Sequence, residues 1–327
     1  MTHEEFMISA AFFFVALVVS CWCVPIFNRR LRHAGIVGKD LHKPGQPEIS
    51  EMGGLAVVVG FSSGLVLAAA IMSFFHLFTS VNLVSLLAVL CTILFAGLIG
   101  LIDDLLGMRQ WVKALLPAIA ALPLMAVRAG HTWLVVPFVG RVDFWIFYPL
   151  FLIPAAVTVA ANAVNMLAGF NGLEVGMGLV AMASLAALAG ILHQTLAFIL
   201  LLSGLGALLG MICYNWYPAR ILVGDVATLS IGAILATGVI VGNFETAGVI
   251  VLIPYAIDFL FKAAHGFPKS FGELRSDGKL HCPARGPVGL GQFIMKLTGG
   301  IHERTLVILL MGIEAVFGTM AVLLYVL

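Results

Sequence analysis

Apolar runs long enough to cross a membrane occupy most of this sequence of 327 residues. Hydrophobic residues make up 61% of the chain and charged residues only 10%, whereas soluble proteins carry roughly 25% charged residues. So few charges cannot cover a compact soluble body, which excludes a soluble enzyme, a disordered protein and a secreted disulfide scaffold. About ten runs approach the 20 apolar residues that a spanning helix needs, at residues 6–26, 53–75, 82–102, 112–129, 144–162, 174–192, 195–214, 226–242, 246–263 and 305–326.

The prediction is therefore an all-α integral membrane protein, with residues 1–327 forming one polytopic domain. The net charge of +1 gives no basic field for a nucleic-acid partner. Five cysteines occur without any C-x-x-C spacing, so we expect buried, reduced thiols rather than zinc ligands or disulfides. Glu4 and Glu5 stand where a signal peptide would be basic, so the run 6–26 is expected to be an uncleaved first span.

Basic residues fall almost entirely on one side of the predicted spans. Of the 17 Lys and Arg residues, only Arg128 and Arg141 lie on the other side. The connections on that side are mostly short, except for 130–143, which could form a small hairpin. The positive-inside rule then places both termini outside and the basic loops in the cytoplasm. These cytoplasmic loops are 27–52, 103–113, 162–174, 215–225 and 264–304.

A single polar face favours chemistry at the cytoplasmic membrane surface. The alternative class is a secondary transporter, which would place its polar groups near mid-membrane. Only Asp258 and Glu314 are candidates for such groups, and no inverted repeat is evident.

Acidic residues mark the inner ends of two predicted spans. Asp103 and Asp104 end the third span, and neighbours on a helix point about 100° apart. Asp225 follows Gly224 at the start of the eighth span, where it serves as an N-cap, as a ligand, or as both. Lys113 lies nine residues after Asp104 and either binds a phosphate as a point charge or snorkels at a helix end.

Amide side chains gather at the inner end of the fifth span. Asn162 and Asn165 are three residues apart and share one face of a helix, while Asn171-Gly172 is a turn signal. Amide oxygens can bind Mg²⁺ or a nucleotide, or they can simply cap a helix. Hard oxygen ligands without a His/Cys cluster favour Mg²⁺, with Mn²⁺ as the alternative, and nearby basic residues indicate phosphate chemistry. The location at a membrane surface indicates a lipid phosphate as one reactant.

Two cytoplasmic loops add candidate contacts. The segment 38–41, Gly-Lys-Asp-Leu, and Glu51 form either a binding surface or an ordinary turn and helix start. The loop 264–304 contains His281 and Arg285 in a Gly/Pro-rich stretch. Such a loop either closes over an anionic substrate or contacts the anionic inner leaflet.

In these motifs the chain resembles the polyprenyl-phosphate N-acetylhexosamine-1-phosphate transferases. The string NAVNMLAGFNGLE at 162–174 is similar to the signature of the archaeal and eukaryotic branch, which uses UDP-GlcNAc and dolichyl phosphate. The resemblance covers essentially the whole chain. It implies ten helices, an inner-face active site, a multi-pass protein of an archaeal-type cell membrane, and a homodimer.

The resemblance also implies roles for individual residues. Asn165 and Asp225 would bind Mg²⁺, and Lys113 would bind phosphate. The implied acidic pair is Asp103 and Asp104, one of which deprotonates the lipid phosphate or orients Lys113. The implied substrate contacts are uridine contacts at Lys39, Asp40, Leu41, Glu51 and Asn171, and a lipid-phosphate contact at Asn162.

The sequence departs from the family pattern at three places. The eukaryotic C-P-R-H-R run is expected at 282–286, where it reads Cys-Pro-Ala-Arg-Gly, so His281 and Arg285 are the candidates for a pyrophosphate or sugar clamp. The triple histidine of the peptidoglycan branch is absent, which disfavours a muramyl-pentapeptide donor. Leu222 replaces an aromatic residue that stacks on uracil. GlcNAc is the default sugar, with another UDP-acetamido sugar or undecaprenyl phosphate as alternatives.

Overall fold

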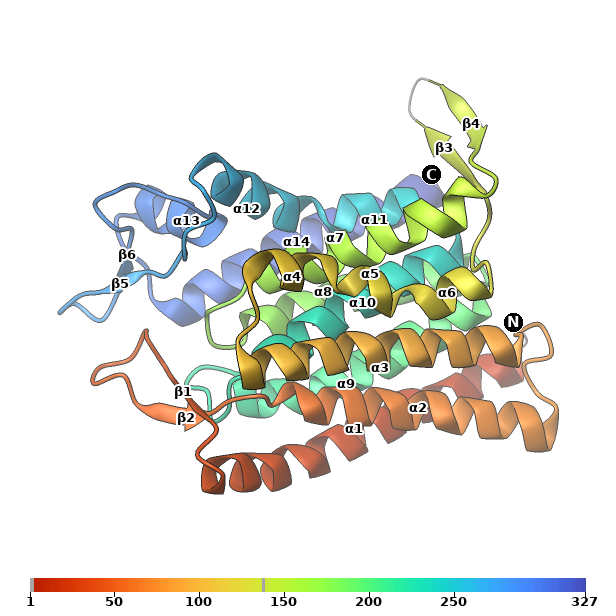
Figure 1. Cartoon of the computed structure of the whole chain (residues 1–327), viewed down its shortest axis with the longest axis horizontal. Coiled ribbons are helices and arrows are strands. Elements are labelled where there is room, and N and C mark those ends of the chain that lie inside the picture. Colours follow the sequence, from red (N-terminus) through yellow and green to blue (C-terminus); the bar gives the residue numbers. More distant parts are fainter. Residues whose placement is uncertain (1–2, 137–138) are drawn as a thin grey trace.

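The computed structural model describes residues 3–136 and 139–327 and is a bundle of helices with three short hairpins. Both chain ends lie at one end of the bundle, and the β1–β2 and β5–β6 hairpins lie at the opposite end, here called the inner end (Figure 1). The long helices are α1 (His3–His33), α2 (Gly54–Phe75), α3 (Leu83–Leu106), α7 (Ile153–Met166), α8 (Leu173–Ile191), α9 (Thr195–Asn215), α10 (Gly224–Gly242) and α14 (Glu303–Val326).

Shorter elements complete the fold. A π-helical turn, Tyr148–Leu152, leads directly into α7. The three hairpins are antiparallel pairs, β1 (Val37–Lys39) with β2 (Glu48–Ser50), β3 (Trp133–Val136) with β4 (Gly140–Asp143), and β5 (Glu273–Leu274) with β6 (Leu280–His281). The short helices are α4 (Gln110–Leu115), α5 (Pro117–Ala120), α6 (Leu122–Ala126), α11 (Glu245–Val251), α12 (Ile253–Ala264) and α13 (Leu290–Thr298).

Among the described residues, eight helices are long and apolar enough to cross a membrane, or nine if the bent pair α11–α12 is one span. This confirms an all-α membrane protein. The predicted run 246–263 is broken by a 55° bend, with Pro254 in the first turn of α12. The predicted run 112–129 is divided into three short helices; Pro117 begins the second, and Pro123 is the second residue of the third. A proline lacks the N–H that continues a helix, so these breaks follow from the sequence. The hairpin expected within 130–143 is present as β3–β4.

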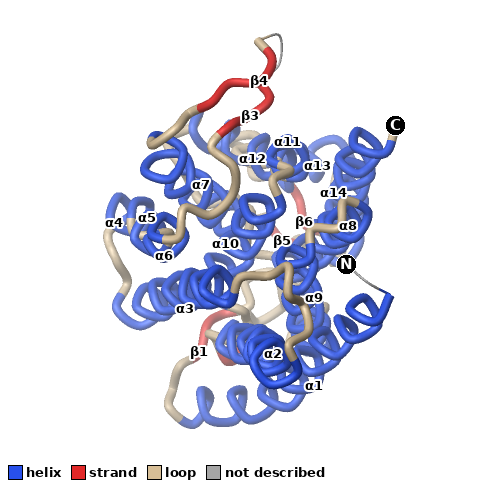
Figure 2. The backbone as a smooth tube through the Cα atoms, turned by 90° about the vertical axis from the view of Figure 1, so that its right-hand side faces the viewer, coloured by secondary structure: helices blue, strands red, loops and turns tan. Residues whose placement is uncertain are grey.

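Helix α10 lies in the middle of the bundle (Figure 2), and 83% of its span is buried. Glycines let its neighbours approach it closely. A methyl group added at Gly100 of α3 would lie 2.4 Å from the carbonyl oxygen of Asp225, and one added at Gly232 would lie 2.5 Å from the Cα of Ala161 in α7. Small residues are the usual means of close helix packing in membranes. This packing brings the inner ends of α3, α7 and α10 together.

Candidate functional site

A cavity of about 1300 Å³ lies between the inner ends of these helices, the β1–β2 hairpin and the loop after α12. Most of the predicted site residues line it, although they come from five separate segments of the chain. The predicted residues in its wall are Lys39, Asp40, Leu41, Glu51, Lys113, Asn162, Asn165, Asn171 and Asp225.

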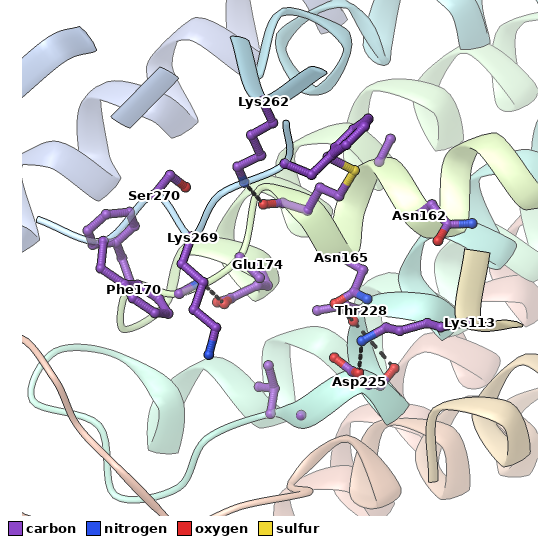
Figure 3. A pocket seen from close by; sticks show the side chains of 18 of the residues that line it. Lys113, Asn162, Asn165, Phe170, Glu174, Asp225, Thr228, Lys262, Lys269 and Ser270 are labelled. Carbon is purple, nitrogen blue, oxygen red and sulfur yellow. Dashed lines mark hydrogen bonds and ion pairs between the residues drawn. The ribbon is translucent and has the colours of Figure 1, made fainter. Parts of the chain in front are cut away.

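The ammonium group of Lys113 is the centre of a polar cluster (Figure 3). Its Nζ forms ion pairs with the carboxylates of Asp103, at 2.6 Å, and Asp225. The amide of Asn165 is oriented by the same neighbours: its oxygen lies 3.0 Å from Lys113 Nζ, and its nitrogen donates to Asp225 Oδ1 at 2.9 Å. Two carboxylates and one amide oxygen thus converge on a single cation.

The adjacent residues Asp103 and Asp104 have different partners. Asp103 accepts the N–H of Met108 at 2.7 Å and pairs with Lys113, so it holds the lysine in place. Asp104 instead accepts the backbone N–H groups of Asp225 at 2.8 Å and Val226 at 3.1 Å. Its carboxylate therefore caps the first turn of α10, where the helix dipole favours negative charge. Neither residue is among those that line the cavity.

Gly224 makes this cap possible. Its φ of +71° lies in the left-handed region that favours glycine, and a methyl group there would lie 2.5 Å from Asp104 Oδ2. The Gly-Asp sequence therefore does two things at once. The glycine admits the carboxylate of Asp104, and Asp225 then presents its own carboxylate to the cavity.

The donor set fits a hard divalent cation. Among the described residues, no group of three or more His, Cys, Asp and Glu is arranged to hold a metal. Mg²⁺, however, usually takes only one or two protein carboxylates and completes its shell with water and substrate phosphate. The oxygens of Asn165 and Asp225 both face the cation of Lys113, so two hard oxygen donors lie close together at this point of the cavity wall.

The hairpin side of the cavity carries the predicted uridine contacts. Asn171 Nδ2 donates to Asp40 Oδ2 at 2.9 Å, and both side chains are buried. Glu51 lies beside Gly38 and Leu222, and burial raises the pKa of its carboxyl group.

The opposite side of the cavity holds Asn162. Its Nδ2 donates to the carbonyls of Ala114 at 2.9 Å and Thr158 at 2.8 Å, so this side chain ties α7 to α4.

His281 and Arg285 are the residues that the resemblance implied for a pyrophosphate or sugar clamp. Neither lines the cavity. His281 pairs with Asp277 at 3.0 Å, and the guanidinium of Arg285 donates to the backbone carbonyl of Lys269 at 2.6 Å. Lys269 is itself a lining residue, and its side chain extends into the cavity (Figure 3). The cation that this loop offers to the cavity is therefore Lys269, which was not among the predicted site residues.

Three other polar residues at the inner end were not predicted as site residues. Glu174, the last residue of the NAVNMLAGFNGLE string, lines the cavity and accepts the N–H of Gly169 at 2.7 Å. Thr228 lies one helical turn after Asp225 and donates to its carbonyl at 3.3 Å. Glu303 begins α14 and contacts Lys43 and Asn171. The only sequence feature that pointed to Glu303 was its place as an acidic residue near the start of a predicted helix.

The transporter alternative depended on Asp258 and Glu314. Asp258 pairs with Lys262 at 2.8 Å and accepts the N–H of Leu290 at 2.8 Å, so it ties α12 to α13 near the inner end. Glu314 is fully buried in α14, and its carboxylate has no hydrogen bond to any described part of the chain. Asp258 is thus a locally paired residue, and the polar cluster of this molecule lies at the inner end.

Comparison with known proteins identifies relatives along most of the chain. The sequence model of glycosyl transferase family 4 matches residues 86–243. A Dictyostelium discoideum protein named UDP-N-acetylglucosamine–dolichyl-phosphate N-acetylglucosaminephosphotransferase is 30% identical over 81% of this chain and 72% of its own length. Proteins that carry the same name provisionally are 37% identical in Saccharolobus solfataricus, over 95% of this chain and 94% of the relative, and 34% identical in Sulfolobus acidocaldarius, over 95% and 93%.

Proposed function

The chain belongs to glycosyl transferase family 4, and we propose that it transfers N-acetylglucosamine 1-phosphate from UDP-GlcNAc to a polyprenyl phosphate such as dolichyl phosphate. The products are lipid-pyrophosphate-GlcNAc and UMP. The names of the relatives indicate this reaction. The observation that carries the proposal is the Lys113 cluster at the wall of a large inner-end cavity, because it gathers the charges that phosphate chemistry needs.

The cavity has a polar side and an apolar side, which suit the two substrates. The nucleotide would lie at the hairpin side, beside Asp40 and Asn171, with its phosphates toward Lys113 and Lys269. The apolar side is lined by exposed side chains that a lipid tail can cover, namely Trp111, Val159, Phe259 and Phe267. A polyprenyl chain can therefore lie against the membrane-facing wall while its phosphate reaches Lys113.

In the reaction, an oxygen of the lipid phosphate attacks the β-phosphorus of UDP-GlcNAc, and the bond between that phosphorus and the UMP oxygen breaks. The lipid phosphate is already ionised at neutral pH, so no covalent aspartyl intermediate is needed. Lys113 and Lys269 bind the non-bridging oxygens, and Asp103 holds Lys113 in position.

We infer that Asn165 and Asp225 hold Mg²⁺ when the substrates are bound. The ion would neutralise charge on the pyrophosphate and on the departing UMP. Asp104 acts on this site through the backbone, since it fixes the first turn of α10 that carries Asp225.

We also infer the arrangement in the membrane. The eight long helices, the bent pair α11–α12 and the broken helices of 110–126 together would cross the membrane ten times. An even number of crossings returns both termini to one side, which agrees with their position at one end of the bundle in Figure 1. The distribution of Lys and Arg supports a cytoplasmic inner end and termini outside. The two similar archaeal proteins support an archaeal-type cell membrane, and family resemblance is the basis for proposing a homodimer.

A doubly labelled donor tests the reaction. UDP-GlcNAc would carry ³H in the sugar and ³²P in the β-phosphate, and the purified protein would receive dolichyl phosphate and Mg²⁺. Phospho-sugar transfer predicts that both labels reach the lipid in the same ratio as in the donor. Transfer of ³H without ³²P would show glycosyl transfer instead and would contradict the proposal.

A further inference from the structure

Glu303 is a buried carboxylate whose two oxygens join segments far apart in the sequence. Its Oε1 accepts the backbone N–H of Asn171 at 2.7 Å, and its Oε2 lies 2.5 Å from Lys43 Nζ. Only 3% of the Glu303 side chain is exposed. Breaking a buried charge pair of this kind is costly because the remaining charge is left without a partner. Glu303 thus connects α14, the turn before α8 and the β1–β2 hairpin.

Lys43 and Asp40 close a ring with these two residues. Lys43 Nζ lies 3.4 Å from Asp40 Oδ2 and 4.0 Å above the ring of Tyr217, while Asp40 Oδ2 accepts from Asn171 Nδ2 at 2.9 Å. We call Asp40, Lys43, Asn171 and Glu303 the hairpin junction. The junction holds the backbone of Asn171 through Glu303 and its side chain through Asp40.

The junction decides which way the Asn171 amide faces. An amide has one accepting end and one donating end of nearly equal size, so its orientation is set by its partners. The carboxylate of Asp40 only accepts hydrogen bonds when ionised, so the nitrogen of the amide must face it. Because Asn171 lines the cavity, the accepting oxygen is the end that is left for a ligand.

We propose that Glu303 is a positioning residue that, together with Lys43 and Asp40, holds the Asn171 oxygen as an acceptor for the N3–H of uracil and so selects uridine over cytidine nucleotides. This inference rests on the proposed function. Uracil carries a proton on N3, whereas cytosine presents a lone pair there. An oxygen held against that lone pair has no partner and is repelled, which weakens binding.

Loss of the Glu303 charge would release this orientation. The ammonium of Lys43 would turn from Glu303 to Asp40 Oδ2, the same oxygen that binds the Asn171 amide nitrogen. The amide would then be free to present either end to the base. Discrimination between the two bases would fall more than affinity for uridine nucleotides.

The test compares UDP and CDP as inhibitors of UMP release from UDP-GlcNAc by the purified, full-length protein. In the wild-type protein we expect CDP to inhibit about 100-fold more weakly than UDP. In Glu303→Gln, which keeps the size and an oxygen for the Asn171 N–H, we expect that ratio to fall below about tenfold. Asp40→Asn replaces a carboxylate that only accepts with an amide that can also donate, and so gives a second variant with the same expected fall. Glu273→Gln removes an exposed carboxylate of the β5–β6 hairpin and serves as the matched control with an unchanged ratio.

Three results would overturn the inference. If the junction variants lose affinity for UDP and CDP equally, Glu303 only supports the fold. If the ratio in both variants equals that of the wild-type protein, the junction does not orient Asn171. If the wild-type protein releases UMP but binds UDP and CDP alike, the base is not selected here, although the proposed function stands. A wild-type protein that releases no UMP would instead remove the proposed function and this inference with it.

Discussion

Lys113 holds two carboxylates and one amide oxygen with a single ammonium group. Without a compensating cation, the carboxylates of Asp103 and Asp225 would repel each other and any incoming phosphate. The same oxygens offer a place for Mg²⁺ once phosphate oxygens can complete its shell. At the scale of the residue, the site is therefore a set of anions that a cation must balance.

Removing either proposed metal ligand should abolish turnover. We expect Asp225→Asn and Asn165→Ala to lower UMP release by at least about 100-fold, because the developing charge on the pyrophosphate loses its counterion. Both variants should still insert into the membrane. Asp277→Asn, an exposed carboxylate in the loop between β5 and β6, is the control. Substantial turnover by either purified variant would contradict the metal assignment.

Lys269 and Arg285 should differ in the size of their effects. Lys269→Met removes a cation from the cavity wall, so we expect KM for UDP-GlcNAc to rise about tenfold, as for loss of one charge-assisted contact. Arg285→Met acts only through the Lys269 carbonyl and should raise KM by less. Arg275→Met, in the exposed hairpin, is the matched control. If Arg285→Met raises KM for UDP-GlcNAc more than Lys269→Met does, Arg285 rather than Lys269 is the cation that binds the substrate.

At the scale of the element, the first turn of α10 depends on Asp104. Its carboxylate accepts two backbone N–H groups, whereas an asparagine amide has only one oxygen. We expect Asp104→Asn to destabilise the protein by about 1–2 kcal/mol, as for loss of a helix cap, and to lower the Tm in detergent. Asp103→Asn leaves this cap intact and is the comparison. A Tm of Asp104→Asn equal to that of the wild-type protein would show that Asp104 does not cap α10.

The β1–β2 hairpin should make stability depend on pH through His42. Its ring stacks on Phe170 at 4.7 Å, and its Nε2 accepts the N–H of Gly272 at 3.3 Å. Burial and the nearby Lys43 lower the pKa of His42 from 6.5 to about 4. Between these values the unfolded chain binds more protons than the folded one, so stability falls as pH decreases from 6.5 towards 4. The loss reaches about 3 kcal/mol for one group.

This pH dependence can be measured as the Tm in detergent between pH 4.5 and 7. His42→Phe, which keeps a ring to stack on Phe170, should flatten the slope over that range. His265→Phe changes an exposed histidine near the end of α12 and should leave the slope as in the wild-type protein. An unchanged slope in His42→Phe would mean that other groups cause the dependence.

At the scale of the whole molecule, the bundle places a polar cavity at one end and an apolar wall beside it. The central position of α10 explains why residues distant in the sequence meet there, since α3 and α7 both reach it through glycine contacts. An enzyme that joins a water-soluble nucleotide sugar to a lipid phosphate needs both environments within one site. The exposed Trp111 and Phe259 at the wall of the cavity supply the apolar one.

The sequence predicts the spans well because apolar length is a local property, but two predicted spans are broken in the structure. Pro117, Pro123 and Pro254 mark the breaks, although a proline in a membrane helix does not by itself show whether the helix bends or ends. The site motifs predict most of the cavity wall. Their partners depend on tertiary packing, so the contact between Glu303 and Asn171, 132 residues apart, could not be read from the chain.

The nucleotide released from UDP-GlcNAc tests the central claim most directly. Purified protein in detergent would receive UDP-GlcNAc, dolichyl or undecaprenyl phosphate and Mg²⁺, with and without EDTA, and the released nucleotide would be identified by chromatography. Phospho-sugar transfer at a metal-dependent Lys113 cluster predicts UMP, and predicts that EDTA abolishes its release. Release of UDP, or release of UMP that EDTA leaves unchanged, would contradict it.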